Sequence, residues 1–447
     1  MSGYDEGAAC GRHGFVVPAR RDRWPNFGLL AIVLAAGGLL SGVFLSFHYA
    51  PTLDAARDSV HHIQDQVTGG SWLRGIHHWA ANFAIVLAAL HGLRLFWHGA
   101  YKKPRRAMWV IGCGIFLVIV GFAYTGYLLP GDERAYAGLG IMKAVAGATP
   151  IAGDAAAKVA IGGDSISSAT LTRLYAIHTM VLPIALALLL GAFFYFWRCV
   201  GPARHHADDT DETASAWTFA VQRDATAGLV VLGLIVLFAW IFPPSLGLKA
   251  DPGGAGAPDA QPEWFLLWVN ELLHMEALSK IPNATFVLAG LIPGVLVALG
   301  IGLPLLFRKP DRDPRKRKPE LVLAGVILLG IGILGGMAAA RAPAVDEPDE
   351  DETGTTTTTN GGVNGDTAAL DEAAARIIKK FKCATCHTID GDEDGGDTGP
   401  ALWRDGSAEA KLPAFPELYT RAFFRRKVGD PEEFWIDTGM TYPRRAG

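Results

Sequence analysis

Cysteine is scarce in this chain. Five cysteines occur among 447 residues, and Cys10, Cys113 and Cys199 are too scattered to indicate a disulfide framework. The segment before the first apolar run is polar and has no cleavable signal pattern, so we expect that run to be its own insertion signal. The formal net charge of −4 is uninformative, because basic and acidic segments are segregated, and we expect no nucleic-acid partner.

Long apolar runs are abundant, since half of the residues are hydrophobic. At about 1.5 Å of helical rise per residue, each run crosses or nearly crosses a hydrocarbon core of about 30 Å. The sequence therefore predicts an all-α fold, a transmembrane helical bundle of seven spans followed by a small all-α domain. The seven runs are Phe27–Phe47, His77–Trp97, Met108–Leu128, Tyr175–Phe196, Thr226–Ile241, Ala284–Phe307 and Leu321–Ala340.

Basic residues predict how the spans are oriented. They cluster before the first span, in 102–106 between the second and third, and in 308–318 between the sixth and seventh. Alternating spans place these three segments on one side, which the positive-inside rule makes cytoplasmic. We therefore expect a multi-pass protein of the bacterial cytoplasmic membrane, with a cytoplasmic N-terminus and the C-terminal domain on the periplasmic side.

Composition divides the chain into four regions. Residues 1–205 hold four spans, and residues 206–342 hold three more. Residues 343–366 are acidic and threonine-rich, a composition that predicts a disordered linker. Residues 367–447 have the character of a soluble domain.

That last region contains a Cys-x-x-Cys-His run at Cys383, Cys386 and His387. This pattern is typical of covalent haem c, in which two thiols bond the porphyrin and the imidazole binds iron. A zinc site is the alternative, but no convincing fourth ligand lies nearby. Met440 is the expected sixth ligand of this haem.

Histidines within the apolar runs predict a second kind of haem site. His77 and His91 are 14 residues apart, nearly four helical turns, so both lie on one face about 21 Å apart along the axis. His178 lies in the fourth run. A histidine within a span is costly and usually functional. We therefore interpret these residues as axial ligands of haem b rather than as buried structural imidazoles.

Glycines repeat the same interval in the neighbouring runs. Gly28 and Gly42 in the first span, and Gly112 and Gly126 in the third, are each 14 residues apart. A residue without a side chain is what a flat macrocycle needs where it leans against a backbone. The shared interval therefore favours two haem levels across the membrane.

Several short motifs carry a family resemblance: Arg74-Gly75-Ile76-His77, His91-Gly92-Leu93-Arg94, Thr125-Gly126-Tyr127-Leu128-Leu129-Pro130, Leu171-Thr172-Arg173-Leu174-Tyr175-Ala176-Ile177-His178 and Pro262-Glu263-Trp264-Phe265. Together they resemble the cytochrome b of bc-type quinol:cytochrome c oxidoreductases. The match is nearest to the split chloroplast-type form, with residues 226–342 similar to its subunit IV fused in line. The C-terminal module resembles a class I monohaem cytochrome c.

The resemblance implies roles at matching positions. His77 and His178 would hold an outer haem b, His91 would belong to an inner one, and Arg74 and Arg94 would meet haem propionates. Glu263 would accept a proton from quinol at an outer site.

The resemblance also implies partners. They are a separate Rieske iron–sulfur protein, a soluble cytochrome c or an oxidase as electron acceptor, membrane lipid and a second copy of the chain. The Rieske protein must be separate because this chain has no suitable pairs of Cys and His.

One departure from the family concerns the inner haem. A second histidine is expected 14 or 15 residues after His178, but Ala192 and Phe193 occupy those positions. Three possibilities follow: a five-coordinate inner haem, an inner haem ligated by another subunit or by water, or no inner haem.

Two other functions are compatible with these motifs. The chain could be a membrane electron conduit that does not itself oxidise quinol, or chiefly an anchor for the cytochrome c domain. Retention of His77, His178 and residues 262–265 argues against the second.

Overall fold

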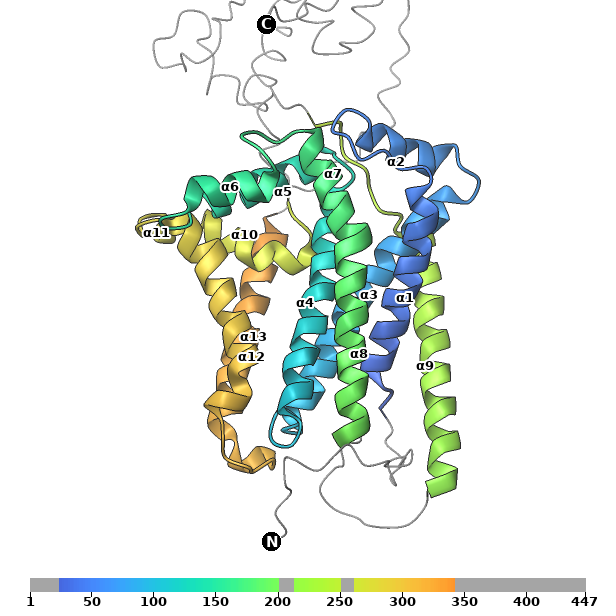
Figure 1. Ribbon diagram of the computed structural model, residues 1–447, viewed down its shortest axis with the longest axis vertical. Helices are drawn as coiled ribbons and strands as arrows, with labels where there is room; N and C mark the ends of the chain where they lie inside the picture. The colour runs from blue at the N-terminus through green and yellow to red at the C-terminus, as the bar shows by residue number, and fades with distance from the viewer. Residues whose placement is uncertain (1–23, 201–212, 251–260, 342–447) are drawn as a thin grey trace, which may run out of the picture. The chain divides into compact units, whose positions relative to one another are not determined.

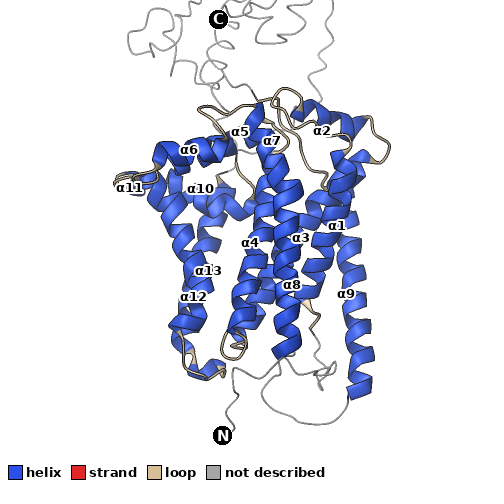
Figure 2. Cartoon of the chain, in the orientation of Figure 1, coloured by secondary structure: helices blue, strands red, loops and turns tan. Residues whose placement is uncertain are grey.

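The computed structural model describes residues 24–200, 213–250 and 261–341, and across these ranges it is all-helical with no strand (Figure 2). Seven stretches there are long and apolar enough to cross a membrane, which confirms the seven predicted spans and identifies an integral membrane protein. The linker 343–366 and the predicted cytochrome c domain 367–447 lie outside the described residues. The spanning elements are α1 (Phe27–Ser46), α3 (Gly70–Trp97), α4 (Arg106–Leu128), α7 to α8 (Ser168–Val200), α9 (Thr213–Ile241), η3 to α12 (Phe286–Leu306) and α13 (Lys318–Ala340).

Short helices gather at one end of the bundle, opposite the α3–α4 and α12–α13 connections (Figure 1). Side-chain caps begin some of them, as where the Asp132 carboxylate accepts a hydrogen bond of 2.9 Å from the backbone N–H of Ala135. The short elements are α2 (Ala56–Asp65), α5 (Glu133–Gly147), α6 (Gly153–Ile161), α7 (Ser168–Ala176), η2 (Trp264–Leu266), α10 (Leu267–His274) and α11 (Glu276–Ser279). Of these, α7 is also the first part of the fourth span.

Helix pairs form the first half of the bundle. Helix α1 packs along α3, and α4 packs along α8, while α3 also contacts α4 and α9. A buried cluster on the mutually facing sides joins α3, α4 and α8. Its fully buried members are Ala84, Ile85, Ile115, Ile119 and Leu186.

The outward faces of the spans are apolar as well. Leu188 in α8 and Leu229 in α9 are each 70% exposed, and Leu329 in α13 is 63% exposed. Exposed leucines on every side of a helix bundle are what contact with lipid tails requires.

Two spans contain a turn of π-helix, and each of these turns is followed by a proline. Residues Ile177–Val181 form η1 and Phe286–Leu291 form η3, and the prolines are Pro183 and Pro293. Proline lacks an N–H and clashes with the carbonyl four residues earlier, so a wider turn relieves the strain just before it. The Leu182 N–H accordingly bonds the carbonyl of Ile177, five residues back.

Two of the predicted basic segments meet at the same end of the bundle. Glu320 at the start of α13 accepts hydrogen bonds from the Tyr101 hydroxyl and from Lys102 Nζ at 3.3 Å, and Arg317 lies 3.4 Å away. All four side chains are buried. This network, the Glu320 cluster, fixes the α3–α4 connection against α13.

Two of the five cysteines lie among the described residues. Cys113 in α4 is a free thiol.

Candidate functional site

His77 of α3 and His178 of η1 face each other across the bundle. Their ring centroids are 6.2 Å apart. Two metal–nitrogen bonds of about 2 Å, plus about 1 Å from each nitrogen to its ring centre, require about 6 Å. The two imidazoles are therefore spaced to bind one metal ion between them.

Hydrogen bonds determine which nitrogen of His77 points inward. Its Nδ1 lies 3.0 Å from the Gly38 carbonyl oxygen and 3.0 Å from Ser41 Oγ. A carbonyl oxygen can only accept, so Nδ1 carries the proton and Nε2 keeps its lone pair for a metal.

His178 is held in the same way from the other helix pair. Its Nδ1 lies 2.8 Å from Thr125 Oγ1, whose own proton is donated to the Gly121 carbonyl at 2.7 Å. The hydroxyl therefore accepts from Nδ1–H, and Nε2 again keeps its lone pair. Matching tautomers on both sides fit an axial pair on one iron.

Glycines leave room beside these imidazoles. A Cβ added at Gly42 would lie 3.0 Å from Cε1 of His77, and one at Gly126 would lie 3.2 Å from Cε1 of His178. A side chain at either position would crowd the imidazole beside it and the space that a porphyrin needs between the helix pairs. The predicted outer site is therefore assembled from four helical elements.

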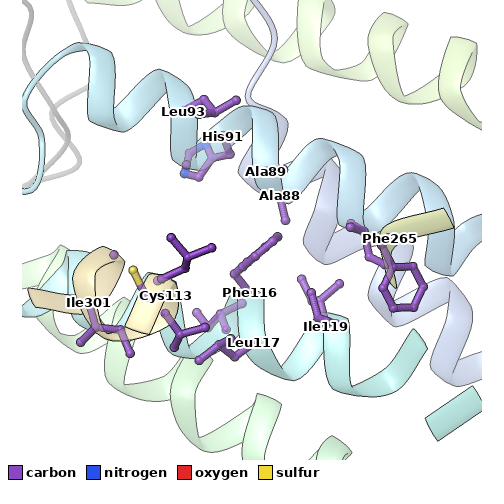
Figure 3. Close-up of a pocket in the computed structure, with 18 of the residues that line it drawn as sticks. Ala88, Ala89, His91, Leu93, Cys113, Phe116, Leu117, Ile119, Phe265 and Ile301 are labelled. Atoms are coloured by element: carbon purple, nitrogen blue, oxygen red, sulfur yellow. The ribbon is translucent and has the colours of Figure 1, made fainter. Parts of the chain in front are cut away.

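At the predicted inner level, only one of the two glycines lies against a histidine. A Cβ at Gly28 would lie 2.8 Å from His91 Nε2, while one at Gly112 would meet nothing within 4 Å. His91 points into a cavity of about 4260 Å³ whose far side includes Phe116 and Ile119 of α4 (Figure 3). A pocket for one small ligand is typically about 300–1,000 Å³, so this cavity has room for a macrocycle and more.

The register of α8 decides which residue faces His91. The π-helical turn at His178 adds a residue, so four turns later the same face is reached at position 193 rather than 192. Phe193 does line the cavity and packs against the cluster that joins α3, α4 and α8. A phenyl ring has no lone pair to donate, so the side opposite His91 offers no ligand from this position.

The two predicted propionate arginines bond backbone carbonyls. The Arg74 guanidinium donates to the Pro244 carbonyl at 2.5 Å and to the Ser245 carbonyl at 3.0 Å. Arg94 donates to the Pro25 carbonyl at 3.0 Å. Arg74 thus anchors the segment after α9 to the helix that carries His77.

Glu263 lies between α9 and η2, outside the spans. Its carboxylate is 3.7 Å from Arg134 Nη2, and 19% of its side chain is exposed. Burial raises the pKa of Glu263 above the usual range, the nearby Arg134 opposes that rise, and Asp132 adds to it. A carboxylate whose pKa is raised in this way holds a proton more tightly than an exposed one, which suits a proton acceptor.

Asn82 fixes the Glu263 segment to α3. The Trp264 indole N–H donates to Asn82 Oδ1 at 2.6 Å, and Asn82 is one turn after His78 on α3. The segment that bears Glu263 is therefore tied to the helix that bears His77.

Sequence reasoning missed Ser41, Thr125, Asp132 and Arg134. Ser41 and Thr125 each stand one residue before a glycine of the 14-residue repeat, which is a signal that could have been noticed. The other two meet Glu263 only through folding. Cys383, Cys386, His387 and Met440 lie outside the described residues.

This all-helical bundle is an integral membrane protein that holds an imidazole pair spaced for one metal ion, with a glycine beside each ring. The family model described as Cytochrome b(N-terminal)/b6/petB matches residues 82–248. The menaquinol:cytochrome c reductase cytochrome b subunit of Bacillus subtilis is 42% identical over 176 residues, which are 39% of this chain and 79% of that protein. The chain belongs to the cytochrome b/b6 family.

Two longer matches extend into the second half. Cytochrome b of Zea mays is 31% identical over 331 residues, covering 71% of this chain and 82% of that protein. A solved structure titled "Hyperthermophilic respiratory Complex III" aligns with a TM-score of 0.64 and 25% identity, over 73% of this chain and 86% of the other. The predicted family resemblance of the membrane part is thus confirmed.

Proposed function

We propose that this chain is the membrane electron-transfer subunit of a quinol:cytochrome c oxidoreductase, oxidising quinol at an outer site. The observation that carries the proposal is the His77/His178 pair, with the Glu263 segment anchored to the same helix through Asn82. These contacts support a role that needs an electron acceptor and a proton acceptor on one helix. A non-bifurcating conduit would need the first but not the second.

The outer pair fits haem b by spacing, tautomer and the glycine clearances described above. When bound there, haem supplies a one-electron acceptor within the membrane. The residues around it orient the ligands: Ser41 and Gly38 hold His77, and Thr125 holds His178.

Glu263 handles the proton. Ionised, it takes a proton from a quinol hydroxyl as the electrons leave, and the buried setting keeps its affinity for that proton high. The cavity that His91 enters is also lined by Pro262, Trp264 and Phe265, which are chain neighbours of Glu263, and this apolar lining suits a quinone ring.

At the inner level we propose a five-coordinate haem held by His91 alone. Gly28 clears one side and Gly112 the other, while Phe193 supplies no ligand. An open iron position facing the large cavity would accept small ligands or lie beside a quinone.

The remaining partners follow from the family. We propose a separate Rieske protein as the first acceptor from quinol. The haem c at Cys383, Cys386 and His387, with Met440 as sixth ligand, would then deliver electrons to a soluble cytochrome c or an oxidase. The complex would be a homodimer in the bacterial cytoplasmic membrane, with residues 1–205 and 206–342 as its haem and quinol-site domains.

Two variants of the purified complex test the outer site. His178→Ala should remove the low-spin haem b absorbance, because one axial ligand and its tautomer lock are lost. Glu263→Gln should retain that absorbance and lose quinol oxidation by about 10²-fold or more. Unchanged quinol oxidation in Glu263→Gln would leave the conduit function as the better description.

Carbon monoxide tests the inner site. A haemochrome count should give two b haems for each c haem, and carbon monoxide should shift the spectrum of only one reduced b haem. Two low-spin b haems, both insensitive to carbon monoxide, would contradict the five-coordinate proposal.

A further inference from the structure

Arg134 has so far been described only as the ion-pair partner of Glu263, yet it reaches three segments. It lies in the first turn of α5. Its Nη2 is 3.7 Å from Glu263 Oε1, and its Nε donates to the Gln261 carbonyl at 3.3 Å. Its Nη1 donates to Ser245 Oγ at 3.5 Å. One guanidinium thus connects α5, the segment after α9 and the Glu263 segment.

The titratable and charged groups near Glu263 belong to α5, to the residue that precedes α5 and to α4. Arg134 attracts the carboxylate, Asp132 at the start of α5 repels it, and the Tyr127 phenol of α4 lies near enough to couple with it. Asp132 is itself immobilised, because its carboxylate accepts 2.9 Å hydrogen bonds from the backbone N–H groups of Ala135 and Gly247. Asp132 is therefore held in place near Glu263, where it disfavours the ionised carboxylate.

We propose that Arg134 is a positioning residue for quinol oxidation, holding the ionised Glu263 carboxylate toward α5 and releasing it when quinol protonates it. The inference rests on the proposed role of Glu263. In the step, one quinol O–H bond breaks as an O–H bond forms on Glu263. The second proton and one electron would go to the iron–sulfur partner and the other electron to the outer haem, so that quinone is the product. Neutral Glu263 no longer attracts Arg134. The protonated side chain can then turn away and shed its proton.

Infrared titration of the purified complex tests the pair directly. The protonated carboxyl band of Glu263 is identified by its loss in Glu263→Gln. In Arg134→Gln the titration midpoint of this band should rise by about one pH unit, because an opposite charge at this distance favours the ionised form. Arg134→Lys should restore most of the wild-type midpoint.

Arg57→Gln is the matched control. The Arg57 Nε donates to the Gly247 carbonyl at 3.2 Å, so this variant loosens the same segment after α9 without removing a charge that acts on Glu263. Its midpoint should equal wild type. An unchanged midpoint in Arg134→Gln, or an equal shift in Arg57→Gln, would overturn the proposal.

Turnover separates this inference from the proposed function. In Arg134→Gln the acid side of the rate–pH profile should move upward together with the infrared midpoint. If the midpoint moves but the profile does not, the positioning role is overturned. If Glu263→Gln oxidises quinol at the wild-type rate, the proposed function fails, whatever the infrared midpoint of Arg134→Gln shows.

Discussion

The side-chain hydroxyls of Ser41 and Thr125 orient the imidazoles of His77 and His178. Each stands one residue before a glycine that borders the same space, on α1 and α4 respectively. Each lies within 3.0 Å of a histidine Nδ1. Groups of this kind set the tautomer, orientation and basicity of metal ligands.

Thr125→Val removes one of these hydroxyls with little change of shape. We expect haem b to be retained about 10- to 100-fold less tightly, because the Nδ1–H of His178 loses its side-chain acceptor. The rate of absorbance loss in detergent measures this. Thr179→Val is the control, since the Thr179 hydroxyl bonds only the Tyr175 carbonyl; equal loss in both variants would refute the role of Thr125.

Gly42→Val tests the clearance beside the outer pair. The new Cβ would stand 3.0 Å from His77 Cε1, with the branches closer to the space for the macrocycle, so haem b should be absent or greatly reduced. Gly37→Val on the same helix should bind haem normally, because nothing lies within 4 Å of a Cβ there. A haemochrome assay compares them, and full haem content in Gly42→Val would show that the glycine is not needed.

At the scale of elements, the Glu320 cluster joins the two halves of the bundle. Glu320→Ala leaves the positive charges of Lys102 and Arg317 buried without their carboxylate. Breaking a buried ion pair in this way costs about 3–5 kcal/mol. Thermal unfolding in detergent should therefore shift markedly to lower temperature.

Lys316→Ala provides the comparison within the same connection. Lys316 pairs with Asp311 at 3.4 Å, but both side chains are more than half exposed. Such a pair contributes about 0–1 kcal/mol. A loss of stability as large as that of Glu320→Ala would show that burial is not what makes the Glu320 cluster strong.

The spans could be predicted from the sequence because hydrophobic length is a local property. All seven expected runs are helices, although three begin at least seven residues earlier than expected: the second at Gly70 rather than His77, the fourth at Ser168 rather than Tyr175, and the fifth at Thr213 rather than Thr226. The Gly70 end is more polar, and packing against α2 extends the helix there. The π-helical turns escaped prediction, since a proline within an apolar run does not specify the type of helical turn before it.

The sites were predictable in part. His77 and His178 could be singled out from the sequence because a histidine in an apolar run is costly and usually functional. Arg134, Asp132 and Asn82 could not, because nothing local distinguishes a surface arginine from one that folding brings to Glu263. The ion pair joins residues 129 positions apart.

At the scale of the whole molecule, the rate of quinol oxidation should depend on pH through Glu263. Only the ionised carboxylate can accept a proton, and burial raises its pKa above the value of about 4.3 for an exposed glutamate. The rate should therefore fall as the pH drops through that raised pKa. Steady-state rates measured from acid to neutral pH check this.

The residual rate of Glu263→Gln serves as the reference for that profile. It should be low and flat across the same pH range, since an amide does not titrate. An acid decline of the same midpoint in Glu263→Gln would assign the dependence to another group.

The π-helical turn at His178 also determines which position of α8 faces His91. A replacement imidazole meant to face His91 belongs at 193, so Phe193→His should convert the inner chromophore to a low-spin, carbon-monoxide-resistant form. The neighbouring Ala192→His, aimed about 100° away around the helix, should leave it unconverted. The one extra residue in the turn before Pro183 thus moves by one the position in α8 at which a new ligand for the inner site would have to be introduced.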